Sequence, residues 1–125
     1  MRLTSERMSV AMLTIKLPTS SRYTDPRTGG SLFRPGVRGC VLKAGAKAHD
    51  ELGALPPGPR VVLLDGHKVR VTEVRLTYID ALTENDFLLQ VIPSWRTPEG
   101  AEAGLTAEHG DSFGRILTVI HFQVI

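Results

Sequence analysis

The sequence contains little cysteine and no long apolar run. Cys40 is the single cysteine among 125 residues, so it can form neither an intramolecular disulfide nor a zinc site by itself. The longest apolar runs cover about five residues, as around Val61–Leu64, whereas a membrane-spanning helix needs about 20. Residues 1–7 lack the apolar segment of a signal peptide. These absences predict a cytoplasmic protein without a membrane partner.

Common catalytic and cofactor-binding motifs are also missing. The sequence contains no Walker A loop, no nucleophile elbow and no dinucleotide-binding glycine motif after a strand. Its histidines (His49, His67, His109 and His121) are far apart in the chain. A metal site could form only if folding brings distant residues together, and we expect neither a metal nor another cofactor. Cys40 has basic neighbours that favour a thiolate, but its apolar surroundings favour a small buried side chain.

Length and composition indicate one folded domain. A chain of 125 residues can bury a core without disulfides. Its hydrophobic content of 42% is ordinary, and a charged content of 22% argues against disorder. Because Met8 could serve as an alternative start, we expect residues 1–7 to form a flexible tail and residues 8–125 to form a single domain.

Charge is distributed unevenly along the chain. Residues 1–47 contain nine lysines or arginines and two acids, whereas residues 48–125 contain six and eleven, respectively. This split could place a basic face on one side of a small fold, where it would attract phosphate groups. Alternatively, the two halves interleave in space and their potentials cancel.

Alternation of apolar with small or polar residues predicts a strand over residues 8–17. Pro18 ends it, and a long loop follows that includes residues 22–39, "RYTDPRTGGSLFRPGVRG". Loops of this length are uncommon in compact domains and are usually functional or mobile. Guanidinium groups match phosphate geometry, and the aromatic side chains between the arginines suit stacking on bases. Alternatively, the aromatic residues attach the loop to the core and the arginines keep it soluble.

Residues 39–52, "GCVLKAGAKAHDEL", predict a short helix, because Val41, Gly45, Ala48 and Leu52 fall on one helical stripe. The next segment predicts a hairpin around Asp65-Gly66, a favoured type I′ turn pair. In the second strand of that hairpin, polar residues alternate with valines, so one face should be exposed to water.

Residues 75–92 predict a strand that gives way to a helix over about residues 83–91. Thr83 is the expected N-cap, and Asp86 would complete a capping box. Residues 93–100 predict a turn, and residues 101–110 at most a weak helical turn. Residues 115–125 predict a terminal strand. This order of elements predicts an α+β fold, a small mixed β-barrel of five to six strands flanked by two or three short helices.

Several segments resemble the ASCH family, a branch of the PUA-like superfamily. "VRVTEVRLTYIDALTEND" (residues 69–86) is similar to a strand and helix start of that family, and "HGDSFGRILTVIHFQV" (residues 109–124) to its last strand. Gly45-Ala46-Lys47 matches its G-x-K element. Residues 53–66 could match its PGD element, and residues 33–37, "FRPGV", offer a rival alignment. The resemblance covers roughly residues 40–124.

The resemblance implies a PUA-like barrel with a cleft associated with RNA or modified nucleosides. Some members hydrolyse N4-acetylcytidine with a lysine, a threonine and a glutamate. Lys47 matches that lysine, but Asp50 stands where the threonine is expected, and the E-x-R element is absent. A catalytic lysine must lose its proton, whereas Asp50 and Glu51 favour the charged form. Lys47 is therefore a weak catalytic candidate and a better phosphate contact.

We therefore predict an RNA- or nucleotide-binding domain, monomeric or weakly dimeric. The candidate phosphate contacts are Arg22, Arg27, Arg34, Arg38, Lys43 and Lys47, and the candidate stacking residues are Tyr23, Phe33 and Trp95. One alternative is an amidohydrolase that acts on an acylated nucleoside. A second is a protein-interaction module with no nucleic-acid role.

Overall fold

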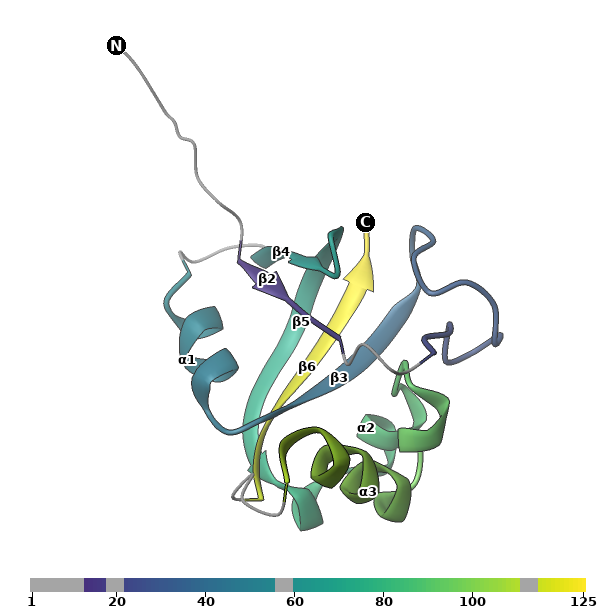
Figure 1. Ribbon diagram of the computed structural model, residues 1–125. Coiled ribbons are helices and arrows are strands. Elements are labelled where there is room, and N and C mark those ends of the chain that lie inside the picture. Colours follow the sequence, from purple (N-terminus) through teal and green to yellow (C-terminus); the bar gives the residue numbers. More distant parts are fainter. Residues whose placement is uncertain (1–12, 18–21, 56–59, 111–114) are drawn as a thin grey trace.

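The computed structural model describes residues 13–17, 22–55, 60–110 and 115–125 (Figure 1). The predicted tail, residues 1–7, and the first part of the predicted strand, residues 8–12, lie outside these ranges. The strands are β2 (Thr14–Ile15), β3 (Arg38–Ala44), β4 (Arg60–Leu64), β5 (His67–Tyr78) and β6 (Ile116–Val124). The α-helices are α1 (Lys47–Gly53), α2 (Glu84–Leu88) and α3 (Pro98–His109), and two 3₁₀ turns cover Ile79–Ala81 and Pro93–Trp95.

The strands form one curled, mixed sheet in the order β2-β4-β5-β6-β3. β2 runs parallel to β4, and the other neighbours are antiparallel. Figure 1 shows the sheet curling into a half-barrel, with the longest strands, β5 and β6, at its centre. A register shift between Val71 and Glu73 of β5 marks a bulge, which bends a strand and increases its twist. The predicted α+β class, with five strands and three short helices in the described residues, is confirmed.

The predicted hairpin is confirmed at its turn and in its alternation. Asp65 and Gly66 join β4 to β5 with φ angles of 49° and 85°, as a type I′ turn requires. Val69 and Val71 are buried, whereas the residues that alternate with them are exposed. One face of this part of β5 is therefore wet, as expected.

The helix predicted over residues 39–52 is wrong in its first half. Residues 38–44 form β3, which pairs with β6 along its whole length, and the helix begins only at Lys47. Residues 39–42 are all buried, so both faces of β3 are covered and the sequence shows no two-residue alternation. Gly45 has φ 77° and turns the chain between strand and helix.

Helix α2 begins as predicted, but it ends at Leu88 and not at residue 91, because Gln90 pairs with Cys40 of β3. The hydroxyl of Thr83 accepts a hydrogen bond from the backbone N–H of Asp86, and the Asp86 carboxylate accepts one from the backbone N–H of Thr83. This reciprocal pair is the capping box. It also fixes the position of the Asp86 carboxylate.

The prediction of no more than a weak helical turn over residues 101–110 is wrong, because this segment up to His109 belongs to α3, a regular helix of 12 residues that begins at Pro98. Its start signals lie upstream: Thr97 caps the helix by accepting from the Gly100 N–H, and Pro98 occupies its first turn. Ala101 and Leu105 bury its inner face. Tertiary packing of these residues stabilises the helix.

The helices cover both faces of the sheet. The His49 N–H of α1 donates to the Thr118 hydroxyl, while Asp86 of α2 contacts His121. These two residues of β6 point to opposite faces because side chains alternate along a strand. Residues 117–122 are consequently all buried. No helix in the described ranges combines the length and the apolar character that a membrane span requires.

Candidate anion-binding cleft

The Arg-rich loop between residues 22 and 37 contains neither helix nor strand, but it is tied to the domain. The Thr24 N–H donates to the Val91 carbonyl at 2.9 Å, and the Gly36 N–H donates to the Val124 carbonyl at 2.8 Å. Leu32 lies in the core with 2% of its surface exposed. The loop is therefore attached near its start, its middle and its end.

One side of this loop forms an open cleft of about 530 Å³. Arg27, Arg34 and Arg38 line it, and all three are exposed. Arg38 is the first residue of β3, so the sheet edge supplies one guanidinium and the loop supplies the other two. The described residues that line it are Asp25, Arg27, Thr28, Arg34, Pro35, Gly36, Val37, Arg38 and Leu89.

Asp25 is the only acid among the described residues of this lining, and its carboxylate is held within the loop. It accepts hydrogen bonds from the Arg27 backbone N–H at 2.9 Å and from the Thr28 hydroxyl at 3.0 Å. The pKa of Asp25 lies below its usual range mainly because the Arg27 N–H donates to its carboxylate. Burial acts in the opposite direction. Asp25 therefore shapes the loop, and the cleft keeps an excess of positive charge.

The three cleft arginines have no ion-pair partner in the part of the chain that the structure describes. None of the ion pairs among the described residues involves Arg27, Arg34 or Arg38. By contrast, Arg75 pairs with two acids and Arg115 with one. The guanidinium groups of the cleft can therefore bind an anionic ligand.

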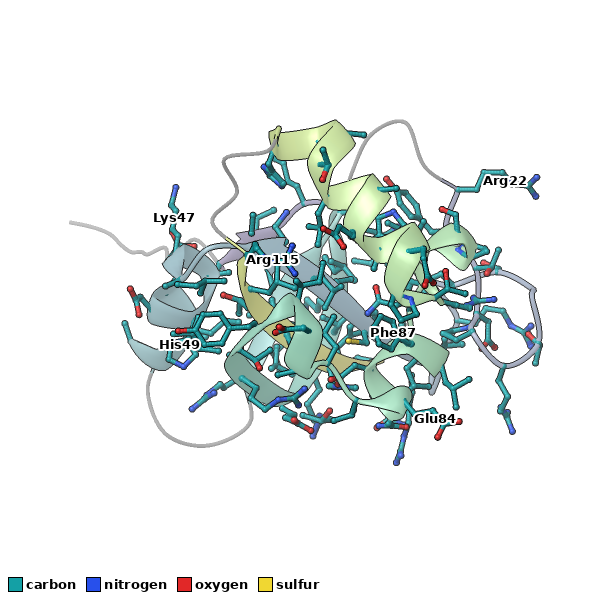
Figure 2. All side chains as sticks on the ribbon, turned by 90° about the horizontal axis from the view of Figure 1, so that it is seen from below. Arg22, Lys47, His49, Glu84, Phe87 and Arg115 are labelled. Carbon is teal, nitrogen blue, oxygen red and sulfur yellow. The ribbon has the colours of Figure 1, made fainter. Side chains whose placement is uncertain are left out.

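The other three predicted phosphate contacts do not line this cleft. Arg22 and Lys47 point outward on opposite sides of the molecule in Figure 2. The ammonium of Lys43 donates to the Lys16 carbonyl at 2.7 Å, and burial lowers the pKa of Lys43. Folding therefore brings together three of the six predicted residues.

The side chains of the three predicted stacking residues pack against other residues of the domain. Phe33 stacks on the ring of His67, with 3.8 Å between centroids and 9° between planes. Tyr23 is half-buried and packs against the core. Trp95 is only 4% exposed, and its ring lies so close to Gly104 that no side chain would fit there. These contacts agree with the interpretation that the aromatic residues attach the loop to the core.

Arg70 is a basic residue beside the cleft that the sequence did not single out. It lines a smaller hollow of about 240 Å³ together with Gln123, and this hollow shares Pro35 and Gly36 with the cleft. The only sequence signal was its place on the exposed face of the predicted hairpin strand. Arg70 can extend the basic surface past the Pro35-Gly36 turn.

A buried polar cluster, also missed from the sequence, centres on Asp86. This carboxylate is 1% exposed, contacts His121 Nε2 at 2.8 Å, and pairs with Arg75 through its other oxygen. Burial alone would raise the pKa of Asp86, but the Thr83 N–H, His121 and Arg75 together hold it below its usual range. The ionised carboxylate is thus the stable form.

Cys40 and Gln90 adjoin this cluster. Cys40 is completely buried, and burial strongly raises the pKa of its thiol. Gln90 donates through Nε2 to the Cys40 sulfur at 3.3 Å and to the Asp86 backbone carbonyl at 2.9 Å. The buried thiol is therefore protonated at neutral pH, in agreement with the expectation of a small buried side chain.

The chain was compared with family models, curated proteins and solved structures, and none of these comparisons found a match. Fold and site define an α+β half-barrel domain with an arginine-lined cleft. The resemblance to the ASCH family stays a prediction from the residues.

Proposed function

We propose that this domain binds RNA or a nucleotide-like anion in the cleft formed by the Arg-rich loop. The observation that carries the proposal is the convergence of Arg27, Arg34 and Arg38 on one cleft, where none of them has an ion-pair partner among the described residues. Guanidinium groups bind phosphate through paired, charge-assisted hydrogen bonds.

The dimensions and the composition of the cleft support this proposal. Its volume of about 530 Å³ lies in the range usual for small-molecule sites, about 300–1,000 Å³. Leu89, Pro35 and Val37 add apolar surface beside the arginines, against which a sugar or base can pack. The similarity of residues 40–124 to a family associated with RNA supports the same ligand class.

The proposal is tested by the salt dependence of binding to a labelled single-stranded RNA. Each phosphate contact contributes about 0.7 to the slope of log affinity against log salt concentration. We expect Arg34→Ala/Arg38→Ala to weaken binding and to reduce this slope by about 1.4. Competition by a nucleoside monophosphate then distinguishes a mononucleotide ligand from a longer strand.

A matched control removes two positive charges that do not line the cleft. Arg22→Ala/Lys47→Ala changes the net charge by the same amount at two exposed positions on opposite sides of the molecule (Figure 2). We expect its affinity and slope to stay closer to those of the wild type. No RNA binding at low salt, or equal losses in the two double variants, would contradict a specific role of the cleft.

A further inference from the structure

We propose that Cys40, Asp86 and His121 form a binding site for a divalent transition metal ion such as Zn²⁺. One ligand atom from each residue lies within 4.8 Å of both others, and all three residues are buried. They come from β3, α2 and β6, respectively. This inference does not depend on RNA binding, because none of the three residues lines the cleft.

The backbone brings the three side chains together. Cys40 and His121 are direct partners in the antiparallel pairing of β3 with β6, so their side chains lie side by side on one face. The capping box at the start of α2 holds Asp86 above that pair. The convergence follows from strand register and helix capping, so it does not depend on the chance rotamer of one long side chain.

The donor atoms suit zinc. Thiolate sulfur, imidazole nitrogen and carboxylate oxygen are its usual protein ligands, with bonds of about 2.0–2.3 Å in tetrahedral geometry. Such bonds place the donor atoms roughly 3–4 Å apart, close to their present separations of up to 4.8 Å. Binding would release the thiol proton of Cys40 to solvent. It would also break the hydrogen bond from His121 Nε2 to Asp86 Oδ1, because Nε2 must give up its proton to coordinate a metal through its lone pair, with the remaining ring N–H on Nδ1.

Charge balance permits a divalent ion at this place. The Cys40 thiolate and the Asp86 carboxylate would together compensate its two positive charges. Arg75 pairs with Glu73 as well as with Asp86, so the guanidinium keeps a counter-charge. Arg75 and the Thr83 N–H both contact Oδ2 of Asp86, whereas Oδ1 faces His121. Oδ1 is therefore the oxygen that can act as a metal ligand.

Gln90 lies beside the cluster and carries an unsatisfied polar atom. Gln90 Oε1 is a buried side-chain oxygen without a hydrogen-bond partner in the described part of the chain. The amide nitrogen of the same side chain lies 3.3 Å from the Cys40 sulfur. A buried, unsatisfied oxygen is costly, and this one lies on a side chain that contacts the cluster.

Cobalt spectroscopy tests the site with unusual specificity. Metal-free, reduced protein is titrated with Co²⁺, and thiolate-to-cobalt charge-transfer absorption is recorded. Because Cys40 is the only cysteine, this absorption can come from no other residue. We expect it to saturate at one equivalent of Co²⁺ and to disappear when Zn²⁺ is added.

Variants separate a metal site from a purely structural cluster. We expect Cys40→Ala to abolish the absorption, and Asp86→Asn and His121→Gln to weaken Co²⁺ binding by at least about tenfold. His109→Gln removes an exposed histidine of α3 and should bind as the wild type does. Circular dichroism establishes that each variant is folded.

A second measurement does not require the Asp86 and His121 variants to fold. Zn²⁺ should raise the thermal unfolding midpoint of the wild type but not that of Cys40→Ala, because a ligand stabilises only the state that binds it. Absence of charge-transfer absorption in folded wild-type protein would overturn the proposal. Equal absorption in the wild type, Asp86→Asn and His121→Gln would overturn it as well.

Discussion

Gly39 occupies a position in β3 where no larger side chain fits. A Cβ atom there would lie 2.5 Å from Val91 Cγ1 and 2.9 Å from Phe122 Cζ. Both neighbours are buried in the core, so neither can move away freely. We expect Gly39→Ala to reduce the free energy of unfolding by roughly 1–3 kcal/mol, the usual cost of overpacking. Urea unfolding followed by circular dichroism measures this change.

Gly53 provides the matched control. Apart from its chain neighbours and the backbone of its own helix, no atom of the described residues would lie within 4 Å of a Cβ at this last residue of α1. Gly53→Ala should leave stability unchanged or raise it by up to about 1 kcal/mol, since alanine favours helix. If both variants unfold at the same urea concentration, the close packing at Gly39 is not significant for stability.

Asp25 makes the stability of the domain depend on pH in the acid range. Because the hydrogen bond from the Arg27 N–H and those from Thr28 lower the pKa of Asp25 in the folded state, its ionised form contributes stability above the ordinary pKa of 3.8. This contribution is lost as the pH falls through 3.8 and then through the lower folded-state pKa.

Comparison with Asp25→Asn isolates this effect. The variant keeps one side-chain acceptor but cannot ionise, so it should be less stable than the wild type at neutral pH. The difference should shrink below pH 3.8. Urea unfolding of both proteins across this range measures it, and a difference that does not change with pH would show that Asp25 does not titrate in this way.

At the scale of elements, α3 depends on its N-cap. The Thr97 hydroxyl accepts the Gly100 N–H at 3.1 Å, and it is the side-chain cap of this helix. We expect Thr97→Ala to lower the free energy of unfolding by about 1 kcal/mol, whereas Thr97→Ser should stay close to the wild type. RNA binding should not change, because α3 does not line the cleft. Loss of RNA binding in a folded Thr97→Ala protein would contradict the expectation that α3 does not take part in binding.

The elements also differ in how well local sequence predicted them. The Asp65-Gly66 hairpin and the Thr83 capping box depend on residues close together in the chain, and both predictions are confirmed. β3 was wrongly predicted as helix because its partner, β6, is distant in sequence. A strand buried on both faces shows no alternation, and a spacing typical of a helix then occurs by chance.

At the scale of the whole molecule, the basic first part and the acidic second part of the chain interleave. β2 and β3, both from the first part, occupy opposite edges of the sheet, with β4, β5 and β6 between them (Figure 1). The strand order therefore does not separate the first part of the chain from the second. Positive charge is concentrated locally, where the Arg-rich loop meets the start of β3.

The sequence by itself determined features that depend on neighbouring residues: the α+β class, the hairpin, the cap of α2 and the presence of an Arg-rich loop. Only the tertiary structure decided which arginines share a cleft, since this depends on how the loop is tied to Val91 and Val124. It also placed Cys40, Asp86 and His121 together. These three residues are 46 and 35 positions apart along the chain, and contacts over such separations are set by strand register and packing.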